Sequence, residues 1–200
     1  VQAVGLNFAD LPSSRGTYQG VLPPPFVAGR EFSGIVADTG EAVMGYTTWG
    51  AFAEKVAAKR SLVWPKPESF SFAEAAAFPV NFFTAYLALW KAGQVDPPVD
   101  PASCRGRRRR VLIHAVAGGV GTAALQIATT LGIETFGTAS SDEKLARAKL
   151  LGLDHGIQYV RDDYEEKIRE LTHGEGVDAV LEMLGGEHTA KSVRCLGLFG

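Results

Sequence analysis

The sequence has little cysteine, no excess of either charge and no long apolar run. Its two cysteines, Cys104 and Cys195, are far apart and form no CxxC pair, so neither a disulfide framework nor a cysteine zinc site is indicated. The 20 Lys and Arg residues face 22 Asp and Glu residues, which argues against nucleic acid or an anionic membrane as a partner. No apolar stretch could span a bilayer, and the N-terminus lacks the order of a secretion signal, so we expect a cytoplasmic protein.

Apolar residues make up 46% of the 200 residues, enough for one substantial core or two modest ones. In the first half, short apolar pieces alternate with Gly and Pro turns. We predict strands there at residues 32–37, 42–46 and 51–56. Residues 71–90 have apolar side chains at helical spacing, with Ser71 and Glu74 as a candidate capping pair, and Pro79 should break this stretch into two helices.

The pattern changes after residue 94. Residues 95–101 are rich in proline and residues 105–110 are nearly all arginine, so we interpret residues 95–110 as a linker. The arginine run could contact nucleic acid or an acidic membrane, but in a near-neutral protein a solvated linker is the simpler interpretation.

From residue 111 onward, apolar strands alternate with amphipathic helices. The predicted strands cover residues 111–116, 133–138, 156–160 and 177–184, and the predicted helices cover residues 119–131, 142–151, 162–172 and 187–195. This alternation predicts a doubly wound α/β fold, with a parallel sheet covered on both faces.

The most specific motif is the glycine-rich turn AVAGGVG at residues 115–121, which follows the strand VLIHA and opens a helix. Glycines there allow a tight turn and let the backbone approach a pyrophosphate, whose charge is met by N–H groups at the helix N-terminus. The flanking strand and helix are the context that a dinucleotide site requires, and they disfavour the alternative of a glycine-rich turn without a ligand. We predict that the cofactor-binding residues of this turn are Ala115, Gly118, Gly119, Val120 and Gly121.

The end of the strand predicted at residues 133–138 bears on which dinucleotide is bound. An NAD site carries Asp or Glu there, which accepts from the ribose 2′-hydroxyl. This chain instead has Thr138, Ser140 and Ser141, followed by Lys144. Hydroxyls and a cation suit a 2′-phosphate, so we predict NADPH. For Ser141, a purely structural role as the N-cap of the next helix is equally compatible with the sequence.

Several segments carry a family resemblance that covers essentially the whole chain. They are, in order, GLNFADLPSSRGTYQ, AGREFSGIV, WGAFAEKV, FAEAAAFPVNFFTAY, VLIHAVAGGVG, FGTASSDEK and VDAVLEMLGG. Together they resemble zinc-independent medium-chain dehydrogenases/reductases of the quinone oxidoreductase and zeta-crystallin type. The resemblance implies a GroES-like β-rich domain at residues 1–94 and a Rossmann-type domain at residues 111–200.

The resemblance also implies roles for residues at the cofactor. AxxGGVG is the family's form of the nucleotide motif, so Ala115 is the expected residue there. Lys144 and Tyr159 match the positions that hold the 2′-phosphate and adenosine end, and Gly185 also matches a cofactor-binding position. His114 is expected to pack beside the cofactor rather than to act as a catalytic acid.

The positions that hold catalytic zinc in zinc alcohol dehydrogenases match Asn7, Arg30 and Val80 here. Neither Arg nor Val ligates zinc, and no four-cysteine lobe is present, so we expect no metal. Without a Lewis acid, hydride addition to a quinone or an activated C=C is favoured over alcohol oxidation.

By the same resemblance, residues matching Asn7, Tyr18 and Thr84 line the nicotinamide and substrate cleft. Asn7 and Thr84 would bond the nicotinamide side, and Tyr18 could orient the substrate oxygen or relay a proton. A turn residue for Asn7 and a surface tyrosine for Tyr18 are the plain alternatives. We therefore expect an NADPH-dependent reductase of small-molecule quinones or enones. The alternative is a non-catalytic, NADPH-binding relative with a structural or membrane-associated role.

Relatives of this kind have strands before Val1, a longer connection around residues 39–41 and two further strands after the last predicted helix. Both domains are therefore expected to be incomplete, through missing residues or a truncated gene product. Since the family usually dimerises through the final strand of the Rossmann sheet, a homodimer is an open expectation.

Overall fold

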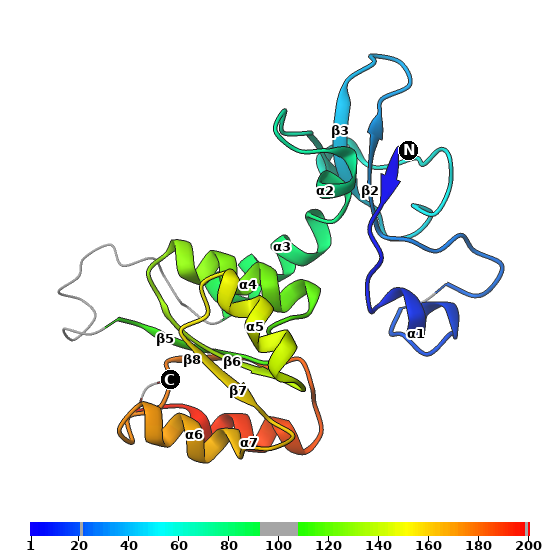
Figure 1. Cartoon of the computed structure of the whole chain (residues 1–200). Helices are drawn as coiled ribbons and strands as arrows, with labels where there is room; N and C mark the ends of the chain where they lie inside the picture. Colours follow the sequence, from blue (N-terminus) through cyan, green and yellow to red (C-terminus); the bar gives the residue numbers. More distant parts are fainter. Residues whose placement is uncertain (21, 93–107, 199) are drawn as a thin grey trace. The chain divides into compact units, whose positions relative to one another are not determined.

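The computed structural model describes residues 1–20, 22–92, 108–198 and 200 of the chain. These residues form two compact units, Val1–Phe83 and Thr84–Gly200, each with its own sheet (Figure 1). Most of the expected linker at residues 95–110, together with Cys104, lies outside the described residues. Among the helices that the structure describes, none is long and apolar enough to cross a membrane.

The first unit is built on an antiparallel sheet whose strands neighbour one another in chain order. The strands are β1 (Ala3–Val4), β2 (Glu31–Ile35), β3 (Ala42–Tyr46) and β4 (Val63–Pro65), and two short helices accompany them, α1 (Asp10–Ser14) and the 3-10 helix η1 (Arg60–Leu62). β2 and β3 pair along their whole lengths, and Phe32 on β2 and Val43 and Met44 on β3 are buried. The strands predicted at residues 32–37 and 42–46 are confirmed.

The strand predicted at residues 51–56 is wrong. The N–H groups of Gly50, Ala51 and Phe52 donate to carbonyls within residues 27–29, at 2.8 to 3.2 Å. Successive N–H groups of an extended strand point to opposite sides, so three consecutive bonds to one segment require a bend. Gly50 begins this bend with φ +93°, a conformation that a side chain would oppose.

The helical stretch predicted at residues 71–90 is broken at Pro79, as expected. α2 (Phe72–Ala76) precedes the break, and α3 (Pro79–Tyr86) begins on the proline and continues into the π-helix η2 (Leu87–Ala92). The Ser71 hydroxyl accepts from the Glu74 N–H at 3.2 Å, while the Glu74 carboxylate accepts from the Ser71 N–H at 2.8 Å. This reciprocal cap satisfies two N–H groups at the start of α2, which packs on β2.

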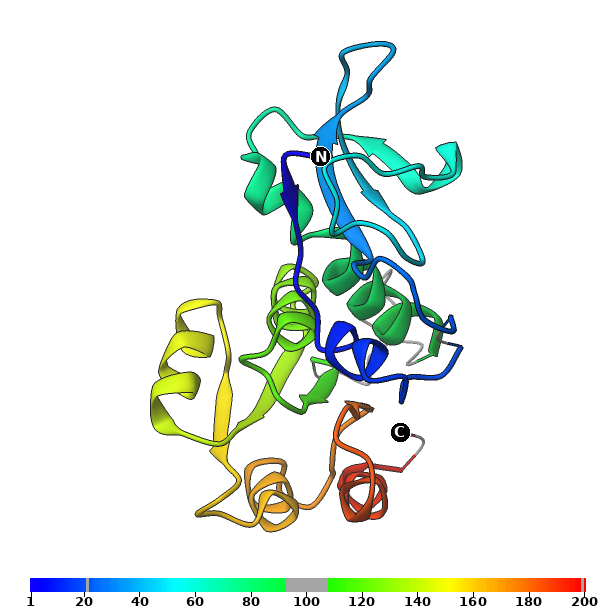
Figure 2. The same ribbon diagram turned by 90° about the vertical axis from the view of Figure 1, so that its right-hand side faces the viewer.

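The second unit is a parallel sheet with helices on both faces. Its strand order is β7-β6-β5-β8, and the strands are β5 (Arg110–Ile113), β6 (Glu134–Ala139), β7 (His155–Gln158) and β8 (Ala179–Leu181). The helices are α4 (Gly119–Thr130), α5 (Asp142–Leu150), α6 (Tyr164–Leu171) and α7 (Glu187–Cys195). α4 and α5 lie on one face and α6 and α7 on the other (Figures 1 and 2). The predicted doubly wound α/β fold is therefore confirmed, with element ends that differ by a few residues.

Apolar strands form the core of this unit. Leu112 on β5 and Phe136 on β6 are fully buried, and they pack with Ile157, Tyr164 and Ile168. A strand that is buried on both faces needs apolar side chains on both, which is why β5 could be recognised from the apolar run that begins at Val111.

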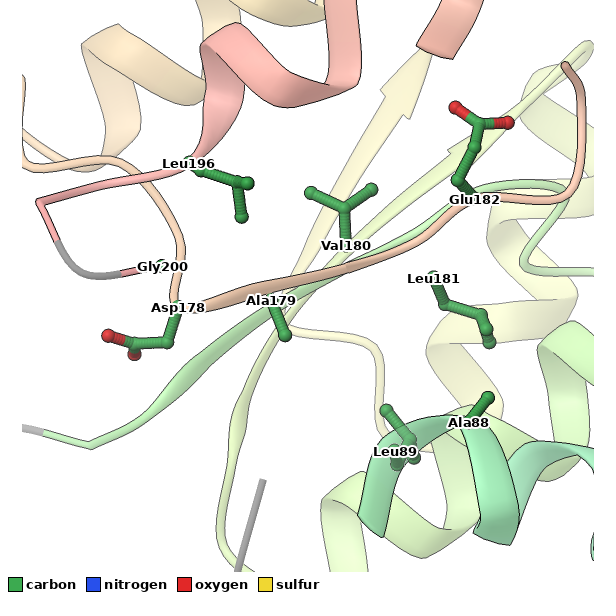
Figure 3. A pocket seen from close by; sticks show the side chains of 9 residues that line it. All are labelled: Ala88, Leu89, Asp178, Ala179, Val180, Leu181, Glu182, Leu196 and Gly200. Atoms are coloured by element: carbon green, nitrogen blue, oxygen red, sulfur yellow. The ribbon is translucent and has the colours of Figure 1, made fainter. Parts of the chain in front are cut away.

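β8 is an edge strand of the described sheet and pairs with β5 alone. A cavity of about 390 Å³ lies along it. Figure 3 shows Val180 pointing towards Leu196 on one side, and Leu181 pointing towards Ala88 and Leu89 on the other. The cavity is thus mostly apolar and belongs to the open edge of the sheet rather than to the glycine-rich turn.

Candidate functional site

The predicted cofactor residues of the second unit gather at one edge of its sheet. Residues 115–121 follow β5, Ser140 and Lys144 follow β6, Tyr159 follows β7, and Gly185 follows β8. Since these four strands are parallel, their carboxyl ends meet at the same edge, where ligands of open α/β sheets bind. The fold therefore brings together segments that are up to 70 residues apart (Gly185 minus Ala115).

The glycine-rich turn has the geometry of a phosphate-binding turn. Ala115 has φ +46°, and its carbonyl accepts from the Gly118 N–H at 2.8 Å. Gly118 is exposed and caps α4 in an extended conformation, so the first N–H groups of that helix have no acceptor within it. These N–H groups and the positive end of the helix dipole suit an anion.

Two glycines of this turn have different structural tasks. A Cβ on Gly121 would lie 2.3 Å from the Ala115 carbonyl oxygen and 2.8 Å from Val116 Cα, so Gly121 permits the close packing of α4 on the turn. A Cβ on Gly118 would meet only the Ala115 oxygen, at 3.1 Å. Gly118 is therefore the one whose missing side chain leaves room on the exposed side.

The end of β6 presents hydroxyls and a cation. Ser141 is the N-cap of α5, with its hydroxyl accepting from the Lys144 N–H at 3.4 Å, so the structural alternative for Ser141 holds. The Ser140 hydroxyl instead accepts from Lys144 Nζ at 2.9 Å. The side chains of Ser140 and Lys144 thus meet beside the end of β6.

The other charges near this strand end are already paired. Arg161 lies 3.1 Å from Asp142 and 3.2 Å from Asp162, and Arg147 lies 2.7 Å from Glu143. Lys144 has no carboxylate partner among the described residues. A 2′-phosphate would meet its charge and the Ser140 hydroxyl, so these residues fit the phosphorylated dinucleotide. Tyr159 is 38% exposed beside them.

Thr138, the remaining predicted cofactor residue, is fully buried and does not face solvent. Its hydroxyl lies 2.9 Å from His114 Nδ1, and His114 Nε2 lies 3.0 Å from the Ser192 hydroxyl. The Ser192 hydroxyl donates to Glu182 at 2.5 Å, so His114 Nε2 must be the donor to Ser192 and Thr138 the donor to Nδ1. Thr138 therefore supports the strand ends from beneath.

This buried chain of hydrogen bonds holds the loop after β8. Glu182 also accepts from the N–H groups of Leu184 and Gly185, at 2.5 and 3.1 Å. Although burial opposes ionisation, these N–H groups and Ser192 keep the pKa of Glu182 below its usual range. Burial lowers the pKa of His114 more than the Glu182 charge raises it, so His114 is neutral.

Sequence reasoning missed Glu182 and Ser192, and it assigned His114 only a packing role. The available signal was the histidine itself, since a buried imidazole needs polar partners. Which residues supply them depends on α7 returning to the end of β5, which no local pattern reveals.

In the first unit, Asn7 is bound to a buried carboxylate that sequence reasoning also missed. Glu31 is fully buried and accepts from Asn7 Nδ2 at 2.8 Å and from the Val80 N–H at 2.7 Å. Burial raises the pKa of Glu31, although these two donors partly offset it. Two of the positions matched to zinc ligands thus converge on one carboxylate. In the described ranges, no group of three or more His, Cys, Asp and Glu residues could hold a metal ion.

Tyr18 is 41% exposed and its ring lies over the guanidinium of Arg30, 5.0 Å from the ring centre to Cζ. The guanidinium also lies 4.5 Å from the ring centre of Trp49. Tyr18 and Asn7 belong to the first unit, whereas Thr84 is exposed on α3 in the second. The three residues expected at the substrate cleft are therefore divided between the two units.

Comparisons with known proteins agree with this arrangement of two units. Residues 1–68 match the family described as "Alcohol dehydrogenase GroES-like domain", and residues 119–200 match the family described as "Zinc-binding dehydrogenase". The whole chain is 37% identical to a synaptic vesicle membrane protein VAT-1 homolog of Rattus norvegicus, of which it covers 49%. The chain therefore spans about half the length of the curated relatives it matches.

Solved structures of oxidoreductases also superpose on nearly the whole chain. The quinone oxidoreductase of Thermus thermophilus, described together with its NADPH complex, superposes with a TM-score of 0.86 at 38% identity, covering 100% of this chain and 61% of that one. The CurK enoyl reductase superposes with a TM-score of 0.84 at 34% identity, covering 98% of this chain and 61% of that one.

Proposed function

Because the chain belongs to the quinone oxidoreductase-like family of medium-chain dehydrogenases/reductases, we propose that this protein reduces a quinone or an enone with NADPH. The observation that carries the proposal is the convergence of the exposed Gly118 turn and the Lys144–Ser140 pair at one sheet edge. The turn suits a pyrophosphate and the pair suits a 2′-phosphate.

NADPH would supply a hydride at its nicotinamide ring when bound. The turn at residues 115–121 would hold the pyrophosphate through backbone N–H groups, and Lys144, Ser140 and Tyr159 would hold the adenosine end. Gly185 would line the site from the loop that Glu182 fixes. The buried bonds of Thr138 and His114 hold the ends of β5, β6 and β8 together beneath it.

The acceptor side would be formed by Asn7, Tyr18 and Thr84. Asn7 is oriented by Glu31, which fixes its amide nitrogen as the donor to the carboxylate and leaves its amide oxygen for a ligand. The exposed phenol of Tyr18 could orient a substrate oxygen or relay a proton. We further propose domains at residues 1–94 and 111–200 joined by a linker, a cytoplasmic setting and a homodimer, as the family resemblance implies.

A second candidate is a non-catalytic NADPH-binding protein. It is favoured by the 37% identity to a relative named for its association with synaptic vesicle membranes. It shares the dinucleotide site with the first proposal but predicts no turnover, so activity separates the two.

The decisive experiment follows NADPH oxidation spectrophotometrically with a panel of quinones, enones and enoyl thioesters. We expect NADPH consumption that depends on the acceptor and equals product formation, and that is lost in Gly118→Val. Tight NADPH binding without consumption by any acceptor would contradict the reductase proposal and support the non-catalytic one.

A further inference from the structure

The region around Arg30 has more hydrogen-bonding capacity than it uses. The guanidinium lies over the rings of both Tyr18 and Trp49, with Cζ 5.0 and 4.5 Å from their centres. Phe26 contacts the Trp49 ring edge-on, with 5.3 Å between the ring centres. We call Arg30, Tyr18, Trp49 and Phe26 the Arg30 cluster.

Within the part of the chain that the structure describes, the charge of Arg30 has no carboxylate partner. Its Nη2 donates to the Ser13 hydroxyl at 3.3 Å, and its buried Nε has no hydrogen-bond partner. The Ser13 hydroxyl donates to the Ala9 carbonyl at 2.6 Å, so it offers Arg30 only a neutral oxygen. The rings of Tyr18 and Trp49 attract the cation through their faces but accept none of its in-plane N–H groups.

This arrangement favours an oxyanion as the missing partner. A partly buried charge is costly unless it is paired, and the planar fork of arginine holds five donors that match an oxygen carrying negative charge. A flat, conjugated molecule also suits the aromatic walls of the Arg30 cluster.

The Arg30 cluster adjoins both first-unit residues that the proposed function places on the acceptor side. Tyr18 is a member of the cluster. Glu31 follows Arg30 directly in the chain and accepts from Asn7 Nδ2 at 2.8 Å. Arg30, directly before β2, and Glu31, its first residue, therefore contact Tyr18 and Asn7, respectively.

We propose that Arg30 is a catalytic residue that binds the acceptor oxygen and stabilises the negative charge formed there, an inference that rests on the proposed function. When the β-carbon of an enone takes up hydride, the C=C electrons move towards the carbonyl and its oxygen becomes an enolate oxyanion. The two electrons and the hydrogen come from NADPH, which is oxidised to NADP⁺. Arg30 donates an N–H to the enolate oxygen, and a proton from water then adds to the α-carbon. With a quinone, the same donor meets the phenolate oxygen of the quinol.

Oxyanion binding can be tested without cofactor or turnover. 4-Nitrophenolate is a flat oxyanion, and calorimetric titration should detect its binding when it is ionised but not when it is protonated. Arg30→Met keeps much of the apolar stem and should weaken this binding roughly ten- to a hundredfold. Arg60→Met removes an exposed arginine of the same unit and should have no effect. Unchanged binding in an Arg30→Met variant with a native circular dichroism spectrum would overturn the proposal.

The catalytic role is tested by NADPH-dependent reduction of a neutral enone and of its carboxylated analogue. With the neutral enone, Arg30→Met should lower kcat about ten- to a hundredfold with little change in KM, because the donor acts on charge that forms in the transition state. Arg30→Lys keeps the charge and should recover part of the rate. A loss confined to KM for the carboxylated enone would identify a carboxylate anchor and overturn the proposal. If the wild type reduces no acceptor, the proposed function and the catalytic role fail together, while the nitrophenolate titration reports separately on the Arg30 cluster.

Discussion

At the scale of single residues, the cofactor side depends on which charges are already paired. Arg161 and Arg147 are bound to carboxylates, whereas Lys144 contacts the Ser140 hydroxyl. A cation held only by a neutral hydroxyl can bind an incoming phosphate without breaking an ion pair. This is the physical basis for expecting a preference between the two dinucleotides.

Lys144→Ala should weaken NADPH binding and leave NADH binding nearly unchanged, because only NADPH carries the 2′-phosphate. We expect a loss of roughly tenfold, at the lower end for a charge-assisted bond, because Lys144 is exposed and screened by solvent. The preference should shrink as salt rises. Fluorescence titration of both cofactors at two ionic strengths measures it.

The matched control is Lys149→Ala, which removes an exposed lysine from the other end of α5. Equal losses for both cofactors in Lys144→Ala, or a preference for NADH in the wild type, would show that the assignment of this strand end is wrong. A carboxylate binding the ribose would then have to be sought.

Gly118 and Gly121 should respond differently to substitution. Gly118→Val should abolish dinucleotide binding in a folded protein, since its side chain would occupy the exposed side where backbone meets pyrophosphate. Gly121→Val should lower the free energy of unfolding by about 1 to 3 kcal/mol or more, because its Cβ would lie 2.3 Å from the Ala115 oxygen. Chemical denaturation and cofactor titration of both variants separate the two effects. Destabilisation of equal size in both would mean that the turn is purely structural.

At the scale of elements, the ends of β5, β6 and β8 are joined by the chain Thr138, His114, Ser192 and Glu182. Every donor of the chain has an acceptor only while His114 is neutral. Protonation of Nδ1 would make the Thr138 hydroxyl an acceptor, take away the acceptor of its own proton and place a charge in a fully buried site. Tyr164 and His188 are the other titratable groups near the imidazole, at 5.0 and 6.4 Å between ring centres.

The free energy of unfolding should therefore depend on pH through His114. Burial lowers its pKa in the folded protein, whereas the unfolded chain takes up a proton near the ordinary value of 6.5. The unfolded state then binds more protons, so stability is complete above that pH and falls as the pH drops below it, by up to about 1.4 kcal/mol per pH unit. Urea unfolding between pH 8 and pH 5, about 3 pH units, measures the slope.

His114→Gln should remove this part of the slope, whatever its effect on stability at high pH. His173→Asn is the control, since His173 is exposed and Asn tolerates its positive φ of +54°. Parallel pH curves for the wild type and His114→Gln would contradict a neutral, buried His114. Carboxylates whose pKa is lowered in the folded protein, such as Glu182, also make the free energy of unfolding depend on pH, but their contribution is lost at a lower pH than that of His114.

At the scale of the whole molecule, the proposed chemistry requires no metal. The zinc-matched positions hold an amide bound to Glu31, a guanidinium and an apolar side chain, and a guanidinium repels a cation. We expect metal analysis of the purified protein to find no stoichiometric zinc, and chelators to leave NADPH oxidation unchanged. Growth in zinc-supplemented medium serves as the control for metal supply. One zinc per chain, or loss of activity on chelation, would refute this.

Features that depend on near neighbours in the chain could be predicted from the amino-acid sequence. Alternating apolar strands and amphipathic helices predicted the doubly wound unit because each pattern spans only one element. The break at Pro79 and the Ser71–Glu74 cap followed from local backbone chemistry. The bend at residues 50–53 was mistaken for a strand because its apolar composition does not show where its N–H groups find acceptors.

Which side chains from distant segments meet depends instead on how the folded chain packs. Glu31 contacts Asn7 across 24 residues and Val80 across 49, and Ser192 reaches His114 across 78. None of these contacts leaves a periodic trace in the chain. The same holds for Arg30, whose charge has no carboxylate partner among the described residues, since its contacts with the rings of Tyr18 and Trp49 depend on the packing of the unit. Local patterns select elements because the periodic spacing of side chains along a helix or a strand depends on near neighbours, whereas sites are assembled by the packing of segments that are far apart in the chain.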